Sequence, residues 1–164
     1  MRHIALHGFG YQEMQKFFPT SVEFPKTLVN WNWWRIFHLS QTLNRAKHPT
    51  TIYGFSDGAT AAAELTTRTP FIRVAYLHSP NTARTRLSHH TRIILFRTQG
   101  DKTPTYSRTY DLFMYNLHEY SHPNIFLHTL IPAPFNDPSP FEKRWLIPLN
   151  HQFHNALPYI EPLL

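Results

Sequence analysis

All glycine in this chain lies in three short turns, and each turn directly follows a strand-like run of residues. The sequence has only five glycines among 164 residues: Gly8 and Gly10, Gly54 and Gly58, and Gly100. A chain so poor in glycine keeps it where the backbone leaves no room for a side chain. We therefore expect these three turns to fix the fold and to carry the function.

Strand-like and helix-like patterns alternate along the chain, which is typical of a parallel sheet covered by helices. The strand candidates are short and apolar: His3–His7, Thr27–Asn30, Thr51–Phe55, Phe71–His78, Arg92–Thr98 and Asn124–Ile131. The helix candidates are Trp34–Arg45, Asp57–Thr67, Thr105–Tyr120 and a C-terminal helix from about Asn155. The sequence therefore predicts an α/β fold, a three-layer α/β/α sandwich with helices on both faces of a mostly parallel sheet of about six strands.

The composition favours one soluble domain. Hydrophobic residues make up 41% of the chain, enough to fill a core, so we expect a single domain over residues 1–164. The absence of cysteine excludes disulfides and cysteine-bound metals, and it favours a reducing compartment. No apolar run has the length of a signal peptide or a membrane span, so we expect a cytoplasmic protein without membrane insertion.

The net charge of +6 raises the question of nucleic-acid binding. The basic residues are scattered along the chain, however, and form no long block. We find no recognisable nucleic-acid-binding motif. The sequence therefore predicts a generally basic surface and no specific nucleic-acid partner.

A G-x-S-x-G pattern places Ser56 between Gly54 and Gly58, directly after a strand candidate and before an alanine-rich helix candidate. In this context the pattern holds a serine on a strained turn at the carboxyl edge of a sheet. A nucleophilic serine also needs a base, a group that orients the base, and donors for the oxyanion. The alternative interpretation is a tight turn in which the serine has no chemical role.

Together with the other two glycine turns, this pattern resembles the α/β-hydrolase family. Residues 7–10, His-Gly-Phe-Gly, are similar to the family's oxyanion loop, and Asp101 follows Gly100 as in its catalytic-acid turn. His151 precedes the last expected helix, where the family has its histidine. The resemblance extends over nearly the whole chain and implies a catalytic triad of Ser56, Asp101 and His151, in the chain order of this fold.

The resemblance also implies an oxyanion hole made by the backbone N–H groups of Phe9 and Asp57. His154 is the alternative base, because it lies in the first turn of the last expected helix. Asp101 is favoured over the other aspartates, Asp57, Asp111 and Asp137, since only Asp101 combines a preceding strand with a turn glycine. The implied protein is a serine esterase that cleaves a small-molecule acyl ester without a metal or another cofactor.

A second pattern, H-E-x-x-H at 118–122, is that of zinc hydrolases in which two imidazoles share one face of a helix. A zinc-dependent hydrolase using His118 and His122 is therefore an alternative function. Pro123 ends the helix directly after the second histidine, and the sequence offers no third ligand. Histidines at the negative end of a helix are the other interpretation. A non-catalytic binding protein that retains the fold is a further alternative.

The chain is shorter than the family pattern. It begins almost on the oxyanion strand, and only Ser79–Thr91 lies where the family often has a lid. The sequence thus predicts a truncated α/β-hydrolase fold with an open site, and a homodimer that covers the shortened edge is compatible with it. We expect Trp31–Trp34 and the proline-rich loop Pro132–Pro148 to wall the pocket.

Overall fold

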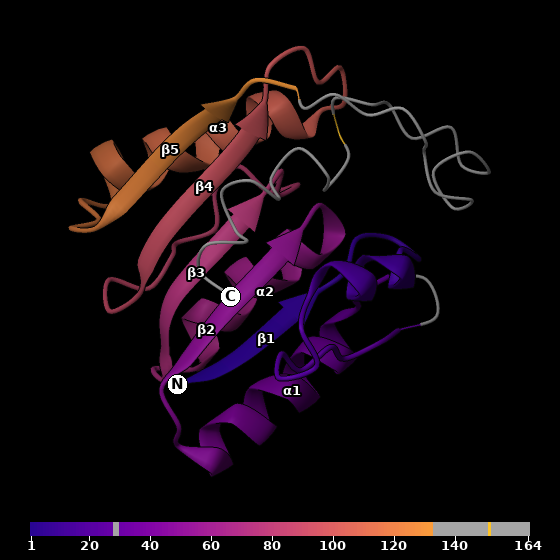
Figure 1. Cartoon of the computed structure of the whole chain (residues 1–164). Helices are drawn as coiled ribbons and strands as arrows, with labels where there is room; N and C mark the ends of the chain where they lie inside the picture. Colours follow the sequence, from indigo (N-terminus) through magenta and orange to yellow (C-terminus); the bar gives the residue numbers. More distant parts are fainter. Residues whose placement is uncertain (28–29, 133–150, 152–164) are drawn as a thin grey trace.

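The computed structural model describes residues 1–27, 30–132 and 151. Five strands form one sheet in which every neighbouring pair is parallel and the spatial order follows the chain (Figure 1). The strands are β1 (Arg2–Leu6), β2 (Thr50–Phe55), β3 (Ile72–His78), β4 (Arg92–Thr98) and β5 (Ile125–Leu130). The α/β class and the parallel sheet are confirmed, and each of these strands ends within one residue of its expected range.

Among the described residues the sheet has five strands, where about six were expected. Thr27 and Asn30 belong to no strand, and residues 28 and 29 lie outside the described part. Thr27 bonds to side chains instead. Its N–H donates to Nε2 of His7 at 3.0 Å, and its carbonyl oxygen accepts from the Gln12 amide. Glu23 pairs with the edge of β1 through two backbone hydrogen bonds of 2.9 Å. The edge that we expected a homodimer to cover is therefore partly occupied by the chain itself.

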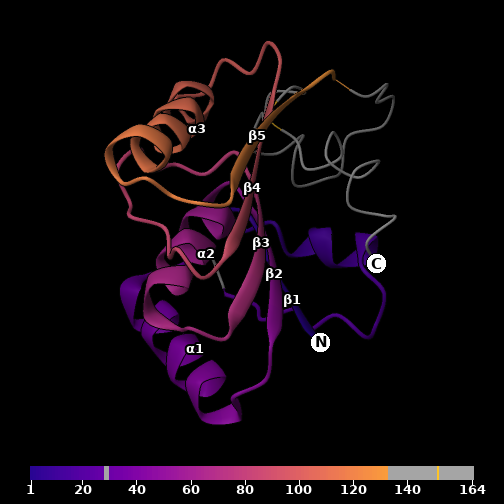
Figure 2. The same cartoon turned by 90° about the vertical axis from the view of Figure 1, so that its left-hand side faces the viewer.

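Three α-helices lie on one face of the sheet (Figure 2). They are α1 (Trp33–Ala46), α2 (Asp57–Arg68) and α3 (Thr105–Met114), and a π-helix, η2 (Tyr115–Glu119), continues α3. Because the strands follow one another across the sheet, right-handed crossovers all pass over the same face. The opposite face carries the 3₁₀-helix η1 (Gln12–Phe17). The expected helix from about Asn155 lies outside the described residues.

The two faces of the sheet bury different side chains. The layer under the α-helices is mainly aliphatic and includes Ile52 and Leu77, whereas the layer on the η1 face is mainly aromatic and includes Tyr53 and Phe96. On the helical side α2 buries small residues, Gly58 among them, together with four alanines. Small side chains allow the start of α2 to lie directly against the ends of β1 and β2.

A Gly58→Ala variant is expected to lose roughly 3 kcal/mol or more of its free energy of unfolding. A Cβ atom on Gly58 would lie only 2.2 Å from the carbonyl oxygen of Leu6 and 2.4 Å from that of His7. Both oxygens are backbone atoms at the end of β1, so strand and helix must separate to admit the methyl group. Urea denaturation measures the loss.

Gly100→Ala is the matched control for this variant. Gly100 has a φ of 80°, so the added methyl group introduces mainly backbone strain, which costs about 1 kcal/mol. Equal losses in the two variants would contradict the close approach of α2 and β1.

Candidate active site

Ser56 lies on a sharp turn between the end of β2 and the start of α2. Its φ of 54° and ψ of −113° form a backbone conformation that is strained for a residue with a side chain. The Ser56 N–H donates to the carbonyl oxygen of His78 at 2.8 Å, which ties the turn to the end of β3. A Cβ atom on Gly54 would lie 2.6 Å from Cα of Ala59, so only glycine allows strand and helix to meet here. The turn places Ser56 at the carboxyl edge of the sheet.

Three side chains from distant parts of the chain form one line of hydrogen bonds. Oγ of Ser56 lies 2.9 Å from Nε2 of His151, and Nδ1 of His151 lies 2.8 Å from Oδ2 of Asp101. His151 and Asp101 are only 7% and 6% exposed, so the polar contacts between them are shielded from water. The ring of His151 also packs on Phe55, with 5.5 Å between the ring centroids. The structure thus brings together the serine, histidine and aspartate selected from the sequence, and His154 lies outside the described residues.

Two threonines that the sequence analysis did not select hold the carboxylate in place. Oδ1 of Asp101 accepts from the N–H and the hydroxyl of Thr103 at 2.9 and 2.8 Å, and Oδ2 accepts from the Thr105 hydroxyl at 3.3 Å. The two hydroxyls also lie 3.1 and 3.3 Å from Nδ1 of His151. Threonine two and four residues after the turn aspartate is a local signal that could have indicated this role.

The surroundings of Asp101 keep it ionised. Burial raises the pKa of its carboxyl group, but the hydrogen bond and charge of His151 and the two hydrogen bonds from Thr103 together lower that pKa overall. An ionised carboxylate accepts a hydrogen bond from the protonated Nδ1 of the imidazole. This tautomer leaves Nε2 of His151 as the acceptor for the hydroxyl proton of Ser56.

The other aspartates have different surroundings. Oδ2 of Asp57 accepts the backbone N–H of Trp31 at 2.8 Å, and burial raises the pKa of this carboxyl group. Asp57 is the first residue of α2, and the N–H groups of the first turn of a helix have no intrahelical partners. Asp111 lies on α3, and Asp137 lies outside the described residues.

The turn after β1 is braced by a neutral histidine. Nδ1 of His7 donates to the carbonyl oxygen of Gly8 at 2.6 Å, while Nε2 accepts from the backbone of Thr27. The indole N–H of Trp31 donates to the His7 carbonyl oxygen at 3.1 Å. Phe9, the expected oxyanion donor, lies in this braced turn next to the strand that leads to the serine. The buried Trp31 therefore supports the turn, a role that the sequence analysis did not predict.

The H-E-x-x-H segment ends a helix and its second histidine is structural. Nε2 of His122 donates to the carbonyl oxygen of Ser88 at 2.8 Å, and Nδ1 accepts the N–H of Asn124 at 3.0 Å. His122 is buried whereas His118 is exposed on η2, so the two rings do not share one helix face. Within the described residues, no group of three or more His, Asp or Glu side chains is arranged to hold a metal ion.

Chelation of metals is expected to leave the melting temperature unchanged, because both ring nitrogens of His122 already have partners in the protein. Differential scanning fluorimetry with and without EDTA measures this. Stoichiometric zinc in the purified protein, together with a lower melting temperature after its removal, would contradict the structural role of His122.

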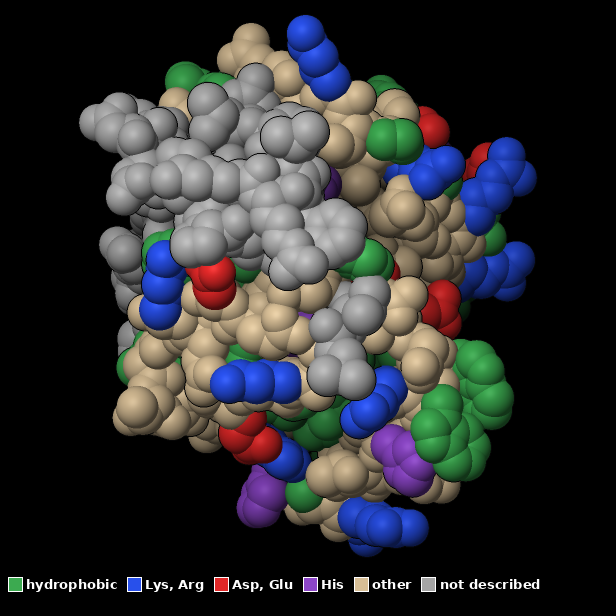
Figure 3. Space-filling model, turned by 90° about the vertical axis from the view of Figure 1, so that its right-hand side faces the viewer, with side chains coloured by type: hydrophobic (Ala, Val, Ile, Leu, Met, Phe, Trp, Pro, Cys, Tyr) green, Lys and Arg blue, Asp and Glu red, His purple; other side chains and the backbone are tan. Residues whose placement is uncertain are grey.

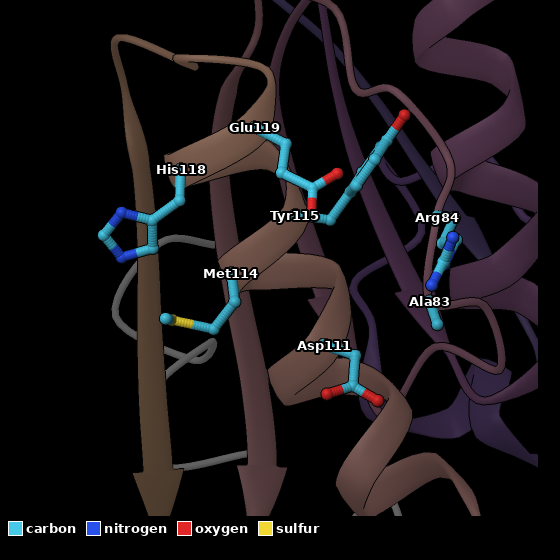
Figure 4. Close-up of a pocket in the computed structure, with 7 residues that line it drawn as sticks. All are labelled: Ala83, Arg84, Asp111, Met114, Tyr115, His118 and Glu119. Atoms are coloured by element: carbon cyan, nitrogen blue, oxygen red, sulfur yellow. The ribbon is translucent and has the colours of Figure 1, made fainter.

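A pocket on the helical side of the sheet lies between the connection after β3 and the α3–η2 helix (Figure 4). It is lined by Ala83, Arg84, Asp111, Met114, Tyr115, His118 and Glu119. Asp111, Tyr115 and Glu119 lie on the side of the helix that faces Arg84. None of the lining residues belongs to the Ser56 site. The loop expected to wall the catalytic pocket, Pro132–Pro148, lies outside the described residues except for its first proline.

Basic side chains are not concentrated in one area on the face of the molecule drawn in Figure 3. Figure 3 shows Lys and Arg side chains spread over that face, with Asp and Glu side chains between them. Among the helices within the described ranges, none is both long enough and apolar enough to cross a bilayer.

Acid is expected to destabilise the fold below about pH 6.5, the usual pKa of histidine. Burial lowers the pKa of His7, His78 and His122, and that of His78 falls to about 3. These rings stay neutral in the folded chain but take up protons in the unfolded chain. Their contribution to stability is therefore complete above the unfolded pKa and is lost as the pH falls, by up to about 1.4 kcal/mol per pH unit for each ring.

Urea denaturation at about pH 7.5 and about pH 5 measures this loss. The difference between the two conditions should shrink in a His78→Gln variant, whose side chain does not titrate. Equal stability of the wild-type protein at the two pH values would contradict neutral burial of these rings.

Solved structures provide a comparison for the fold. A carboxylesterase from Bacillus cereus superposes with a TM-score of 0.56 at 15% identity, over 87% of this chain and 85% of its own. A protein classed as a YdeN-like hydrolase from Pectobacterium atrosepticum gives a TM-score of 0.57 at 14% identity, over 80% and 77% of the two chains. No protein-family model and no curated protein sequence matches the chain. At such identities the likeness establishes the architecture: this chain has an α/β-hydrolase fold, with five parallel strands in its described part.

Proposed function

We propose that this chain is a serine hydrolase that cleaves a small-molecule acyl ester through an acyl-serine intermediate. The observation that carries the proposal is the line of hydrogen bonds from Ser56 through His151 to Asp101, which begins on a strained turn. The α/β-hydrolase fold and its likeness to a carboxylesterase support the same reaction class.

In the proposed reaction, Oγ of Ser56 attacks the ester carbonyl carbon while Nε2 of His151 accepts the hydroxyl proton. Asp101 stabilises the imidazolium that forms. The former carbonyl oxygen takes the negative charge and binds the N–H groups of Phe9 and Asp57 at the positive end of α2. The intermediate then expels the alcohol, which receives the proton from His151. Water attacks the acyl-serine by the same route and releases the acid, so the cycle needs no cofactor.

A fluorophosphonate probe tests this proposal, because it reacts rapidly only with a serine that a neighbouring base activates. We expect one probe molecule per wild-type chain, mapped to the peptide that contains Ser56. An Asp101→Asn variant should react several orders of magnitude more slowly, since the imidazole then loses its favoured tautomer. A folded wild-type protein that takes up no probe would contradict the proposal and favour a non-catalytic binding protein.

A further inference from the structure

The first two turns of α1 carry three exposed aromatic rings that point away from the core. Trp33, Trp34 and Phe37 are 71%, 52% and 36% exposed. Trp33 meets Trp34 edge to face with 5.4 Å between centroids, and Trp34 stacks on Phe37 at 6.1 Å. The rings therefore form one continuous apolar surface, which we call the aromatic patch. A contiguous apolar surface of this kind marks an interaction site more often than isolated exposed rings do.

The charged side chains of α1, the helix that carries the aromatic patch, are positive. The sequence has no Asp or Glu from residue 24 to residue 56, and Arg35 and Arg45 are exposed on α1 itself. The neighbouring helix α2 has two acidic residues, Asp57 and Glu64. The Asp57 carboxylate accepts a hydrogen bond from a backbone N–H, and the Glu64 carboxylate accepts one from a hydroxyl group. Figure 3 shows hydrophobic side chains gathered at one corner of the molecule, with His, Lys, Arg and also acidic side chains near them.

We propose that α1 binds the surface of an anionic lipid bilayer, with the aromatic patch at the level of the headgroups. Tryptophan is favoured at this level because its ring combines a large apolar surface with a polar N–H group. Arg35 and Arg45 add attraction to anionic headgroups. The α1 helix thus has the two components of a peripheral membrane-binding helix, exposed Trp and Phe side chains and cationic residues without acidic ones.

Two other occupants fit the surface less well. A twofold contact between copies of the chain would bring Arg35 of one copy toward the same positive surface of the other, without an acidic partner on α1. Single-stranded nucleic acid binds rings that are spaced so that successive bases stack on them. Here the rings are packed on one another, which leaves fewer free ring faces.

Sedimentation with lipid vesicles tests the proposal on the full chain. We expect the wild-type protein to bind vesicles of phosphatidylcholine and phosphatidylserine in a ratio of about 7 to 3, and to bind pure phosphatidylcholine at least about tenfold more weakly. A Trp33→Ser, Trp34→Ser double variant should lose at least about tenfold in partition to the mixed vesicles. Both side chains are exposed, so the variant should fold, which circular dichroism verifies.

Phe126→Ser is the matched control, because Phe126 is 44% exposed on β5, at the far edge of the sheet from α1. This control should bind the mixed vesicles as the wild type does. A wild-type protein that fails to sediment with them would overturn the proposal, as would a double variant that binds equally well. Self-association that the double variant abolishes, or binding of a single-stranded oligonucleotide in place of vesicles, would assign the aromatic patch to a different partner and also overturn it.

Discussion

A Ser56→Ala variant is expected to lose about four orders of magnitude or more in kcat toward a short-chain p-nitrophenyl ester. The substitution removes the oxygen that lies 2.9 Å from Nε2 of His151 and leaves no nucleophile on the turn. The far-UV circular dichroism spectrum should remain that of the wild type, since the Ser56 N–H still bonds to the end of β3. Release of p-nitrophenol, measured at saturating ester, gives the loss directly.

Ser107→Ala is the control for this variant. Ser107 is exposed on α3, and its hydroxyl donates to a backbone oxygen in the preceding turn, so its removal should leave kcat unchanged. If the folded Ser56→Ala variant retains most of its activity, the proposed mechanism is contradicted. The same loss in Ser107→Ala would show that the assay reports protein integrity and not the nucleophile.

Most of what the sequence could predict of the fold and of the candidate site came from the glycine turns. A Cβ atom on Gly54 or Gly58 would overlap backbone atoms, so these positions specify a close contact of strand and helix whatever surrounds them. Such a requirement is local, and it can be recognised from a short pattern. The residue ranges of the strands follow from equally local patterns of apolar residues.

Apart from the Ser56, His151 and Asp101 contacts, which the family resemblance implied, contacts between distant segments could not be predicted. Thr27 has a strand-like neighbourhood in the sequence, yet its backbone bonds to His7 and Gln12, which lie many residues away. The hydrogen bonds from Thr103 to Asp101 could have been predicted more easily, because both residues belong to one turn. Nothing local, in contrast, distinguishes a histidine that braces a turn from one that takes part in chemistry.

A His151→Ala variant is expected to lower kcat by about four orders of magnitude, whereas His154→Ala should lower it far less. Nε2 of His151 is the acceptor placed for the Ser56 proton, and its Nδ1 is held by the ionised Asp101. Without this imidazole, the hydroxyl has no base and the departing alcohol has no acid. Ester turnover under saturating conditions measures both variants.

The opposite ranking would transfer the base to His154 and leave Asp101 without its partner in the reaction. Equal and modest losses in both variants would contradict a triad altogether, because removal of the general base of a triad lowers kcat by several orders of magnitude.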